Sequence, residues 1–256
     1  MSTPLAVDEQ SRLRRWNIGA GLLHLTSLVL IVILANGYRL PVTTVYPTGA
    51  PGTTYSDSIH LFSIPVAGVI IAFLGLSAFF HFLIASGQVF PKYLEGLSHQ
   101  KNAYRWVEYS LSSTLMILVI AQLNGITNAA ALLAICTANV AMILFGWLQE
   151  EFTTPGDGRW LPFMFGCIVG AVPWVIFAIQ LWGPKAPPAS SPPGFVYGIV
   201  VSLFVLFNCF AVVQLLQYRA KGKWADYLRG ERAYIILSFV AKSLLAWQIF
   251  AGTLAK

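Results

Sequence analysis

Seven stretches of about 20 apolar residues recur along the chain, and they constrain its fold more than any other feature. A helix of that length spans the roughly 30 Å of hydrocarbon in a bilayer. Of the 256 residues, 57% are hydrophobic and only 10% are charged, which is typical of membrane proteins. The stretches lie near Asn17–Ala35, Ile59–Ala85, Ala103–Leu123, Ala129–Leu148, Leu161–Trp182, Phe195–Gln217 and Ala233–Leu254. We therefore expect an all-α membrane protein, with residues 1–256 forming a single domain of seven transmembrane helices.

Features of several other protein classes are missing from the sequence. The first apolar stretch follows a polar arm and lacks a clear small-residue cleavage site, so we expect it to remain as a helix rather than leave as a signal peptide. Cys136, Cys167 and Cys209 fall inside apolar stretches without disulfide or zinc spacing, and we interpret them as small core residues. The net charge of +6 gathers at the ends of the stretches, which indicates contact with anionic lipid rather than with nucleic acid.

The basic residues also predict the orientation in the membrane. Alternate connections that start with the amino-terminal arm carry twelve of them, and the opposite connections carry three, namely Arg39, Lys185 and Lys256. The twelve are Arg12, Arg14, Arg15, Lys92, Lys101, Arg105, Arg159, Arg219, Lys221, Lys223, Arg229 and Arg232. Because cytoplasmic loops carry the excess of Lys and Arg, we expect a multi-pass cell-membrane protein with a cytoplasmic N-terminus and an extracellular C-terminus.

Two outer connections have distinct compositions. Residues 36–58 are rich in Thr, Tyr, Val, Pro and Gly, which favours a small β-hairpin between the first and second helices. Such a segment is either a flexible surface loop or a docking element for a second protomer. The second connection, GPKAPPASSPPG from Gly183, is dense in proline and is expected to be extended.

Lys242 is the single charged side chain of the last apolar stretch, AYIILSFVAKSLLAWQIFAGTL from Ala233. An ammonium at the bilayer centre costs roughly 2.5–3.5 kcal/mol even on the lenient insertion scale, so an ionisable residue there is a functional candidate by default. Lys242 lies ten residues past Arg232, or roughly 15 Å along a helix. An amine can form a Schiff base with an aldehyde, and covalent attachment of a chromophore is a task that requires one.

Glu108 is the strongest candidate for the anion that a buried Lys242 needs. We expect it to be the only carboxylate within the hydrophobic core, with Glu150 and Glu151 at the cytoplasmic mouth of their helix. The alternative for Glu108 is an interfacial acid stabilised by the helix dipole. Tyr109, Ser112 and Met116 continue the same helix without another charge, Ser112 on the face of Glu108, and we include all three among the candidate cofactor-binding residues.

Ser238, His24 and His81 complete the candidate site. Ser238 precedes Lys242 by four residues, so its hydroxyl either contacts the lysine nitrogen or bonds to its own helix carbonyl. His24 and His81 lie at depths similar to that of Glu108 on their helices, which predicts a shared polar cavity. Each histidine taken alone favours a structural role in the core, but histidine and carboxylate at the same depth can together hold a mobile proton near neutral pH, so both roles stay open.

Four segments carry a resemblance to a known family. They are RWVEYSLSS from Arg105, ILFGWLQE from Ile143, PGFVYGI from Pro193, and GKWADYLRGERAYIILSFVAKSLLAWQIF from Gly222. The chain resembles the heliorhodopsins, the inverted microbial rhodopsins, over almost its full length. The resemblance implies a homodimer that carries all-trans retinal on Lys242, with Glu108 as counterion. It also implies that Ser238, His24 and His81 belong to the Schiff-base environment or the adjacent cavity, and that the outer hairpin contributes to the dimer.

Departures from the rhodopsin pumps shape the functional prediction. Pumps have an aspartate four residues before the lysine, where this chain has Ser238, and often a second acid eleven residues after the first, where it has Val119. The Trp-x-x-Tyr-Pro pattern of their sixth helix is absent from SLFVLFNCF at Ser202. We therefore expect a light sensor without net ion transfer, and no enzymatic activity.

Two alternatives and one partner remain open at this point. A light-driven proton transporter or channel would use His24, His81 and Glu150 as relays. A retinal-free receptor or enzyme would use Lys242 as a structural or catalytic amine. The basic segment KGKWADYLRGER from Lys221 is available to a cytoplasmic signalling partner, or serves only as an orientation signal.

Overall fold

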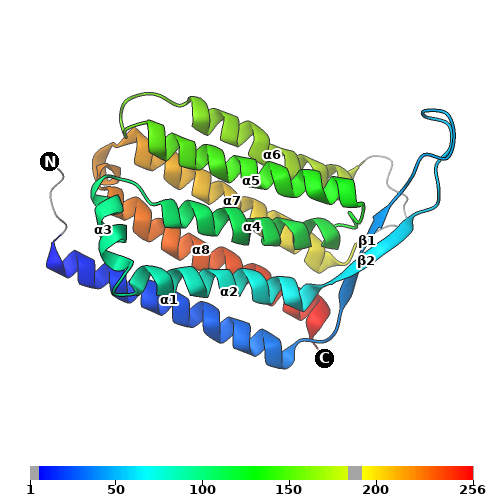
Figure 1. Cartoon of the computed structure of the whole chain (residues 1–256), viewed down its shortest axis with the longest axis horizontal. Helices are drawn as coiled ribbons and strands as arrows, with labels where there is room; N and C mark the ends of the chain where they lie inside the picture. The colour runs from blue at the N-terminus through cyan, green and yellow to red at the C-terminus, as the bar shows by residue number, and fades with distance from the viewer. Residues whose placement is uncertain (1–5, 184–191, 256) are drawn as a thin grey trace.

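The computed structural model describes residues 6–183 and 192–255, which form a bundle of seven long helices (Figure 1). The long helices are α1 (Val7–Leu34), α2 (Val66–Ala85), α4 (Ala103–Leu123), α5 (Ala129–Phe152), α6 (Leu161–Trp182), α7 (Gly194–Arg219) and α8 (Tyr227–Ile249), which continues into the π-helical turn η2 (Phe250–Leu254). All seven are long and apolar enough to cross a membrane. The seven-helix prediction is therefore confirmed.

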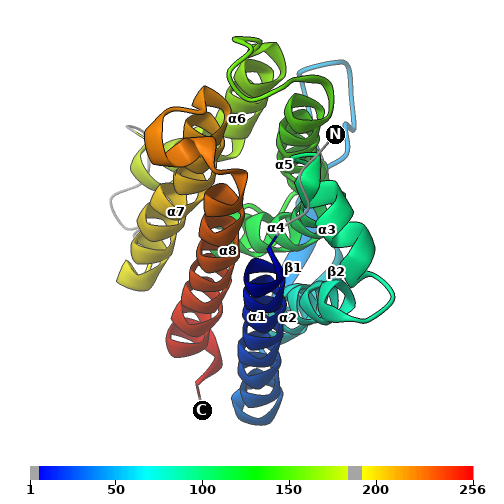
Figure 2. The same cartoon turned by 90° about the vertical axis from the view of Figure 1, so that its left-hand side faces the viewer.

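The helices pack as a closed bundle in which most sequence neighbours also lie side by side. α8 lies between α7 and α1 and so closes the bundle, while α4 lies inside it (Figure 2). The described ends of the chain lie at opposite ends of the bundle, the start of α1 at one and η2 at the other (Figure 1). We refer to these as the α1-start end and the hairpin end.

The predicted hairpin is present and projects beyond the bundle at the hairpin end (Figure 1). Strands β1 (Arg39–Thr44) and β2 (Ile59–Pro65) pair antiparallel, with Val42 opposite Phe62. Val42 is buried, and the Thr43 backbone N–H donates to the Thr127 carbonyl at 2.8 Å. The base of the hairpin is therefore anchored to the connection between α4 and α5.

The prediction of where the second transmembrane helix begins is wrong. Residues 59–65 form β2, and α2 begins only at Val66. Ile59–Ala85 is mostly apolar, and an apolar run cannot by itself distinguish a strand from a helix. Pro65 marks the boundary, because it takes an extended conformation at the N-cap of α2.

Several polar segments are helical beyond the predicted apolar stretches. α1 begins at Val7 rather than near Asn17, α8 begins at Tyr227 rather than near Ala233, and η1 (Gly222–Ala225) is a turn of 3₁₀ helix. The short helix α3 (Phe90–Ser98) was not predicted. It is amphipathic, and it buries Tyr93 and Leu97, one helical turn apart, against the bundle. The proline-dense segment that we expected to be extended lies mostly outside the described residues.

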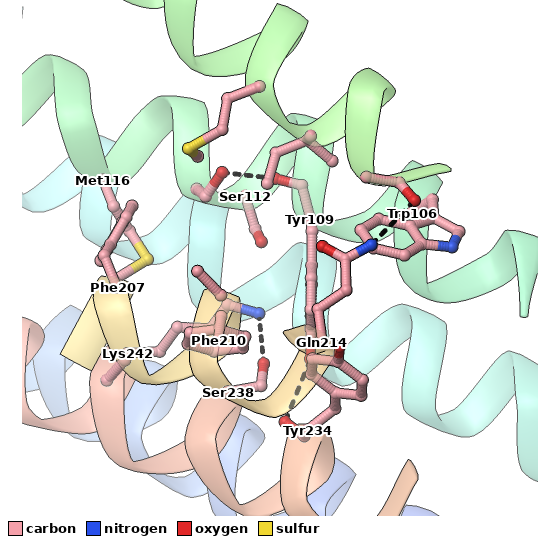
Figure 3. A pocket seen from close by; sticks show the side chains of 16 residues that line it. Trp106, Tyr109, Ser112, Met116, Phe207, Phe210, Gln214, Tyr234, Ser238 and Lys242 are labelled. Carbon is pink, nitrogen blue, oxygen red and sulfur yellow. Dashed lines mark hydrogen bonds between the residues drawn. The ribbon is translucent and has the colours of Figure 1, made fainter. Parts of the chain in front are cut away.

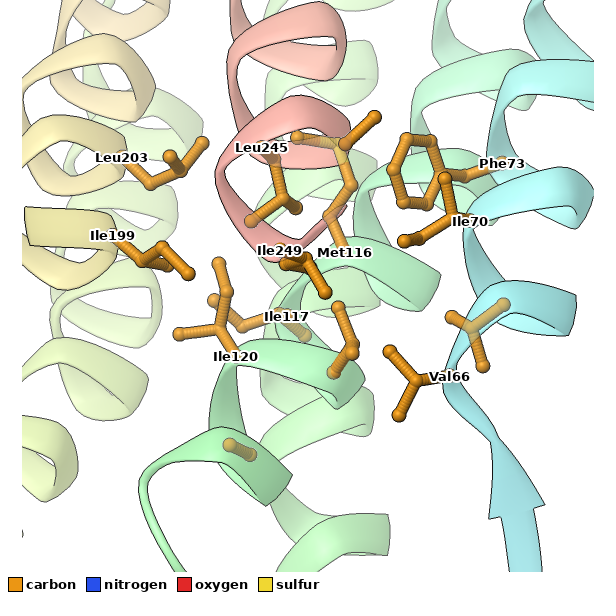
Figure 4. Close-up of a cluster of buried hydrophobic side chains, with 14 of the residues drawn as sticks. Val66, Ile70, Phe73, Met116, Ile117, Ile120, Ile199, Leu203, Leu245 and Ile249 are labelled. Atoms are coloured by element: carbon orange, nitrogen blue, oxygen red, sulfur yellow. The ribbon is translucent and has the colours of Figure 1, made fainter. Parts of the chain in front are cut away.

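The largest hydrophobic core occupies the hairpin half of the bundle (Figure 4). Its side chains come from the parts of α2, α4, α7 and α8 that lie toward the hairpin, and include Val66, Ile70, Phe73, Met116, Ile117, Ile120, Ile199, Leu203, Leu245 and Ile249. In the described chain, the buried ionisable groups lie at Lys242 or on its other side, toward the α1-start end. The two halves of the bundle therefore have very different interiors.

Candidate functional site

Lys242 of α8 and Glu108 of α4 form a buried ion pair near the middle of the bundle. The lysine Nζ donates to the glutamate Oε1 at 2.6 Å, and the two residues are 3% and 5% exposed. Neither charge can be tolerated alone in an apolar interior, because an unpaired buried ion loses its hydration without compensation. The structure thus brings together the two residues that the sequence suggested as partners.

Two serines complete the hydrogen bonding of this pair. The Lys242 Nζ also donates to the Ser238 Oγ at 2.7 Å, since the two residues are one helical turn apart on α8. The Ser77 hydroxyl of α2 donates to the Glu108 Oε1 at 2.6 Å. Sequence reasoning missed Ser77, although its position four residues before His81 places both on one face of α2.

An apolar pocket opens beside the lysine, between α4, α5, α7 and α8 (Figure 3). Lys242 and Ser238 lie at one side of it, and seven of the sixteen lining residues are aromatic or methionine. The lining includes all three further candidates from the sequence, Tyr109, Ser112 and Met116. The other lining residues are Trp106, Ser113, Met142, Ile143, Gly146, Phe207, Phe210, Ala211, Gln214, Tyr234 and Ala241.

The chemistry of the pocket fits a retinal chromophore attached to Lys242. A primary amine lies beside a mostly apolar wall, and the Ser112 hydroxyl is fully buried without a hydrogen-bond partner among the described residues. The cavity volume is about 100 Å³, below the roughly 300 Å³ or more of typical ligand pockets. A polyene therefore requires the wall to adjust, and the flexible side chains of Met116 and Met142 provide for this.

The histidines lie on the α1-start side of the ion pair. His24 of α1 and His81 of α2 stack with ring centroids 5.7 Å apart, and the His81 Nδ1 is 2.9 Å from the Asn17 Oδ1. His81 lines a small cavity together with Glu108 and Ser238. His24 does not line that cavity, and neither of its ring nitrogens has a hydrogen-bond partner in the described chain. The structure thus places His81 and Glu108 on one cavity, and His24 contacts His81 from outside that cavity.

The prediction that Glu108 is the only core carboxylate is wrong. Glu150 of α5 and Glu231 of α8 are each 2% exposed and form ion pairs with Arg105 of α4. Arg105 is itself 5% exposed, although the sequence suggested a marker of the membrane surface. Glu231 was missed because it precedes the expected helix start at Ala233. The spacing of Arg105 and Glu108, three residues apart on one helix face, was a signal that could have indicated a second buried charge.

The sequence matches one family of known proteins over most of its length. The profile of the family described as Heliorhodopsin matches residues 13–254. No curated protein matches the sequence.

Solved structures of microbial rhodopsins share the fold. The transmembrane domain of Salpingoeca rosetta rhodopsin phosphodiesterase is 12% identical, with 94% of this chain and 84% of that chain covered and a TM-score of 0.68. A thermophilic rhodopsin is 14% identical, covering 98% and 96%, with a TM-score of 0.64. The light-driven proton pump LR (Mac) from Leptosphaeria maculans is 14% identical, covering 97% and 96%, with a TM-score of 0.63. At such identities the likeness establishes the rhodopsin fold alone.

Proposed function

The chain belongs to the heliorhodopsin family, and we propose that it is a light sensor that binds all-trans retinal on Lys242 and signals without net ion transfer. Family membership and the seven helices make it a multi-pass membrane protein with a retinal chromophore. The observation that carries the residue assignment is the buried amine of Lys242 beside an apolar pocket, with one carboxylate 2.6 Å away.

Each polar residue around Lys242 has a distinct task in this proposal. Bound retinal supplies the absorption of visible light and the change of shape that follows. Lys242 Nζ holds a proton and directs it toward Glu108, whose negative charge stabilises the positive nitrogen. Ser77 and Ser238 fix the geometry of that pair through hydrogen bonds of 2.6 and 2.7 Å. Tyr109 adds its ring, whose centroid is 5.2 Å from the nitrogen.

The unequal halves of the bundle support sensing without net transport. A transported proton needs groups that accept and release it on both sides of Lys242. Toward the α1-start end the described interior offers Glu108, His81 and Glu231, whereas toward the hairpin it offers aliphatic and aromatic side chains and the amides of Gln122 and Asn124. A proton that leaves Lys242 therefore meets buried titratable side chains on one side only among the described residues, and returns from that side.

Retinal reconstitution with matched variants tests the assignment. Addition of all-trans retinal to the purified protein is expected to produce a visible absorption band in the wild type and in Lys92→Ala, which alters a lysine of α3 outside the pocket. The band is expected to be absent in Lys242→Ala. A visible band of normal intensity in Lys242→Ala would overturn the attachment site. Steady light-driven currents in voltage-clamped cells would overturn the claim that no ion is transferred.

A light-driven proton transporter or channel is the alternative function. It is favoured by the cavity that extends from Ser238 and Glu108 toward the α1-start end, because water in such a cavity can replace side chains as a proton relay. In that case His24, His81 and Glu150 are the expected relays. The alternative predicts a photocurrent that falls in His81→Phe, whereas the sensor predicts none in either protein.

Assembly and orientation belong to the same proposal. We expect a homodimer in the lipid membrane, with β2 in the interface, because Ile59, Leu61 and Phe62 on that strand are 43%, 45% and 55% exposed. The mass of the detergent-solubilised protein from light scattering tests this, and a Leu61→Lys, Phe62→Lys double variant is expected to be monomeric. We also expect the α1-start end to face the cytoplasm, where residues 221–226, the mostly exposed part of the basic segment, are available to a signalling partner. Impermeant labelling of single cysteines in α3 and in the hairpin tests the orientation.

A further inference from the structure

A second group of buried charges lies between the lysine site and the α1-start end. It consists of Arg105 of α4, Glu150 of α5 and Glu231 of α8, and we refer to it as the arginine cluster. The Arg105 guanidinium forms an ion pair with each carboxylate and lies 4.2 Å from the ring centroid of Tyr234. None of its three residues has a role in retinal binding in the proposed function.

Glu150 is the more strongly held carboxylate of the two. Its Oε1 accepts hydrogen bonds from the Asn102 backbone N–H at 2.6 Å and from the Trp106 Nε1 at 2.8 Å. Its Oε2 accepts from Arg105 and from the Tyr227 hydroxyl. Four donors, together with the N-terminus of α4, hold the Glu150 carboxyl group in a fixed position.

Glu231 has fewer donors and faces the site. Its Oε2 accepts from the Arg105 guanidinium at 2.5 Å, and its Oε1 accepts from the Asn102 amide at 2.5 Å and from the Tyr93 hydroxyl at 3.3 Å. Burial raises the pKa of Tyr93 well above its ordinary value, so its hydroxyl stays protonated and can only donate to the carboxylate. All three contacts of Glu231 are thus donors, which indicates that its resting form is the carboxylate.

The charges of the arginine cluster do not balance. One guanidinium faces two carboxylates, so the cluster carries one surplus negative charge, whereas Lys242 and Glu108 balance each other. The N-termini of α4 and α8 lie beside the cluster and offset part of the surplus. A surplus charge in a low-dielectric interior makes the cluster a site that gains stability by taking up one proton.

A cavity connects the two charged sites. It is lined by Glu108, His81 and Ser238 on one side and by Asn102, Arg105 and Glu231 on the other, but not by Glu150. Its volume of about 30 Å³ exceeds the roughly 10–15 Å³ that one water molecule requires. Two lining residues, Arg105 and Tyr234, each present a buried polar atom with no protein partner in the described chain, as is expected where water completes the hydrogen bonding.

We propose that Glu231 is the internal acceptor that stores the proton released from the Lys242 and Glu108 pair. The inference rests on the proposed light sensor. The N–H bond at Lys242 Nζ breaks and an O–H bond forms at Glu108. That O–H bond then breaks as water in the cavity delivers a proton to Glu231. The positive charge on Lys242 is lost, the surplus negative charge of the arginine cluster is lost, and the total charge of the interior stays constant.

The neighbouring groups are less suitable acceptors. A proton on His81 would create a buried cation, whereas a proton on Glu231 removes the surplus negative charge of the arginine cluster. Glu150 does not line the cavity and has one more donor than Glu231. Glu231 and Tyr227 are 2% and 6% exposed, so the stored proton remains inside the protein. A proton stored on Glu231 is therefore not released to the bulk.

Light-minus-dark infrared spectroscopy on the retinal-loaded protein tests the proposal. When the chromophore nitrogen is unprotonated, we expect a positive C=O band of a newly protonated carboxylic acid that shifts in D₂O. The band should disappear in Glu231→Gln and move, while remaining present, in Glu231→Asp. Glu151→Gln removes an acid that is exposed on the surface, and this control should leave the band unchanged.

Three outcomes would overturn the assignment. The band could persist unchanged in Glu231→Gln, it could be lost in Glu150→Gln but not in Glu231→Gln, or a pH-indicator dye could detect one proton released to the bulk per photocycle. If Glu231→Gln does not bind retinal, Glu231→Asp provides the test instead. A C=O band at the wild-type frequency in Glu231→Asp would exclude Glu231 as the acceptor. Failure of the proposed function is distinguishable, since wild-type protein would then form no visible band at all.

Discussion

The two buried ionic sites of this protein are built from similar charges in opposite ways. At the lysine site one flexible ammonium meets one carboxylate, with an apolar pocket on one side and a small cavity on the other. At the arginine cluster a planar guanidinium lies between two carboxylates that accept further bonds from Asn102 and Trp106. The first site has few bonds that must be broken for a proton to move, and the second has many.

The choice of cation follows from these tasks. An arginine side chain stays charged under all ordinary conditions and its fork of donors matches carboxylates, so Arg105 fixes the positions of α4, α5 and α8. A lysine amine can lose its proton and can form a covalent bond, so Lys242 is suited to change its state. The two buried cations therefore have different functions: Arg105 connects helices rigidly near the α1-start end, and Lys242 reacts at the centre.

The largest expected effect comes from removing the reactive cation. Lys242→Ala should abolish the visible band completely, because no other amine lines the pocket in the described structure. The variant also leaves Glu108 without its partner, so its folding must be verified independently. Circular dichroism should show that Lys242→Ala keeps the helix content of the wild type. A folded variant that retains the visible band would show that the lysine site is not the reactive one of the two ionic sites.

Removal of the fixed cation should instead destabilise the fold. Arg105→Met leaves Glu150 and Glu231 buried without a counter-charge, and breaking a buried pair in this way costs about 3–5 kcal/mol. We expect a clear fall in the thermal midpoint of the retinal-bound protein. Lys101→Met is the matched control, since Lys101 and Glu151 form an exposed pair whose loss costs about 0.2–1 kcal/mol. Equal midpoints for both variants would show that the cluster does not hold the helices together.

Neutralising the carboxylate of the lysine site should change colour more than stability. In Glu108→Gln the amide keeps most of the side-chain volume and can still accept from Ser77, but the charge that stabilises the protonated nitrogen is gone. We expect the visible absorption band to shift. We also expect the nitrogen to lose its proton in part of the protein at neutral pH, so that this part absorbs in the near ultraviolet. An absorption spectrum identical to that of the wild type would exclude Glu108 as the counterion.

The smallest effect is expected from Ser77→Ala. The variant removes one hydrogen bond to the Glu108 carboxylate, and a bond to a charged group contributes about 1.5–3 kcal/mol. We expect a modest fall in thermal stability and a small spectral shift in the same direction as in Glu108→Gln. Ser63→Ala, in the hairpin, is the control and should leave the spectrum unchanged. A larger shift in the control than in Ser77→Ala would contradict the geometry.

Much of the fold was predictable because apolar length decides it. Twenty apolar residues have few stable forms other than a helix across a membrane, so all seven helices could be predicted from the sequence. Their ends were less accessible to prediction, because tertiary packing holds polar residues such as Arg14 and Tyr227 in helix beyond the apolar stretch. The second strand of the hairpin is rich in apolar residues and runs directly into the apolar helix that follows it, so the two could not be separated from the sequence.

The lysine site was more predictable than the arginine cluster. A single charge within an apolar stretch is conspicuous, and helix geometry limits which residues can lie at the same depth, so Lys242 and Glu108 could be paired. Arg105 and Glu231 lie in polar segments that are equally compatible with exposed ends of helices. Their burial depends on α3, which brings Tyr93 over the cluster, and on the closure of α4, α5 and α8 around it.

The most direct test of the central claim is a mass measurement on the attachment site. Borohydride reduction of the retinal-loaded protein, followed by proteolysis and mass spectrometry, should find a retinyl group on the α8 peptide, with fragmentation locating it on Lys242. Unmodified Lys242, or a retinyl group on a different lysine in protein that shows the visible band, would contradict the account.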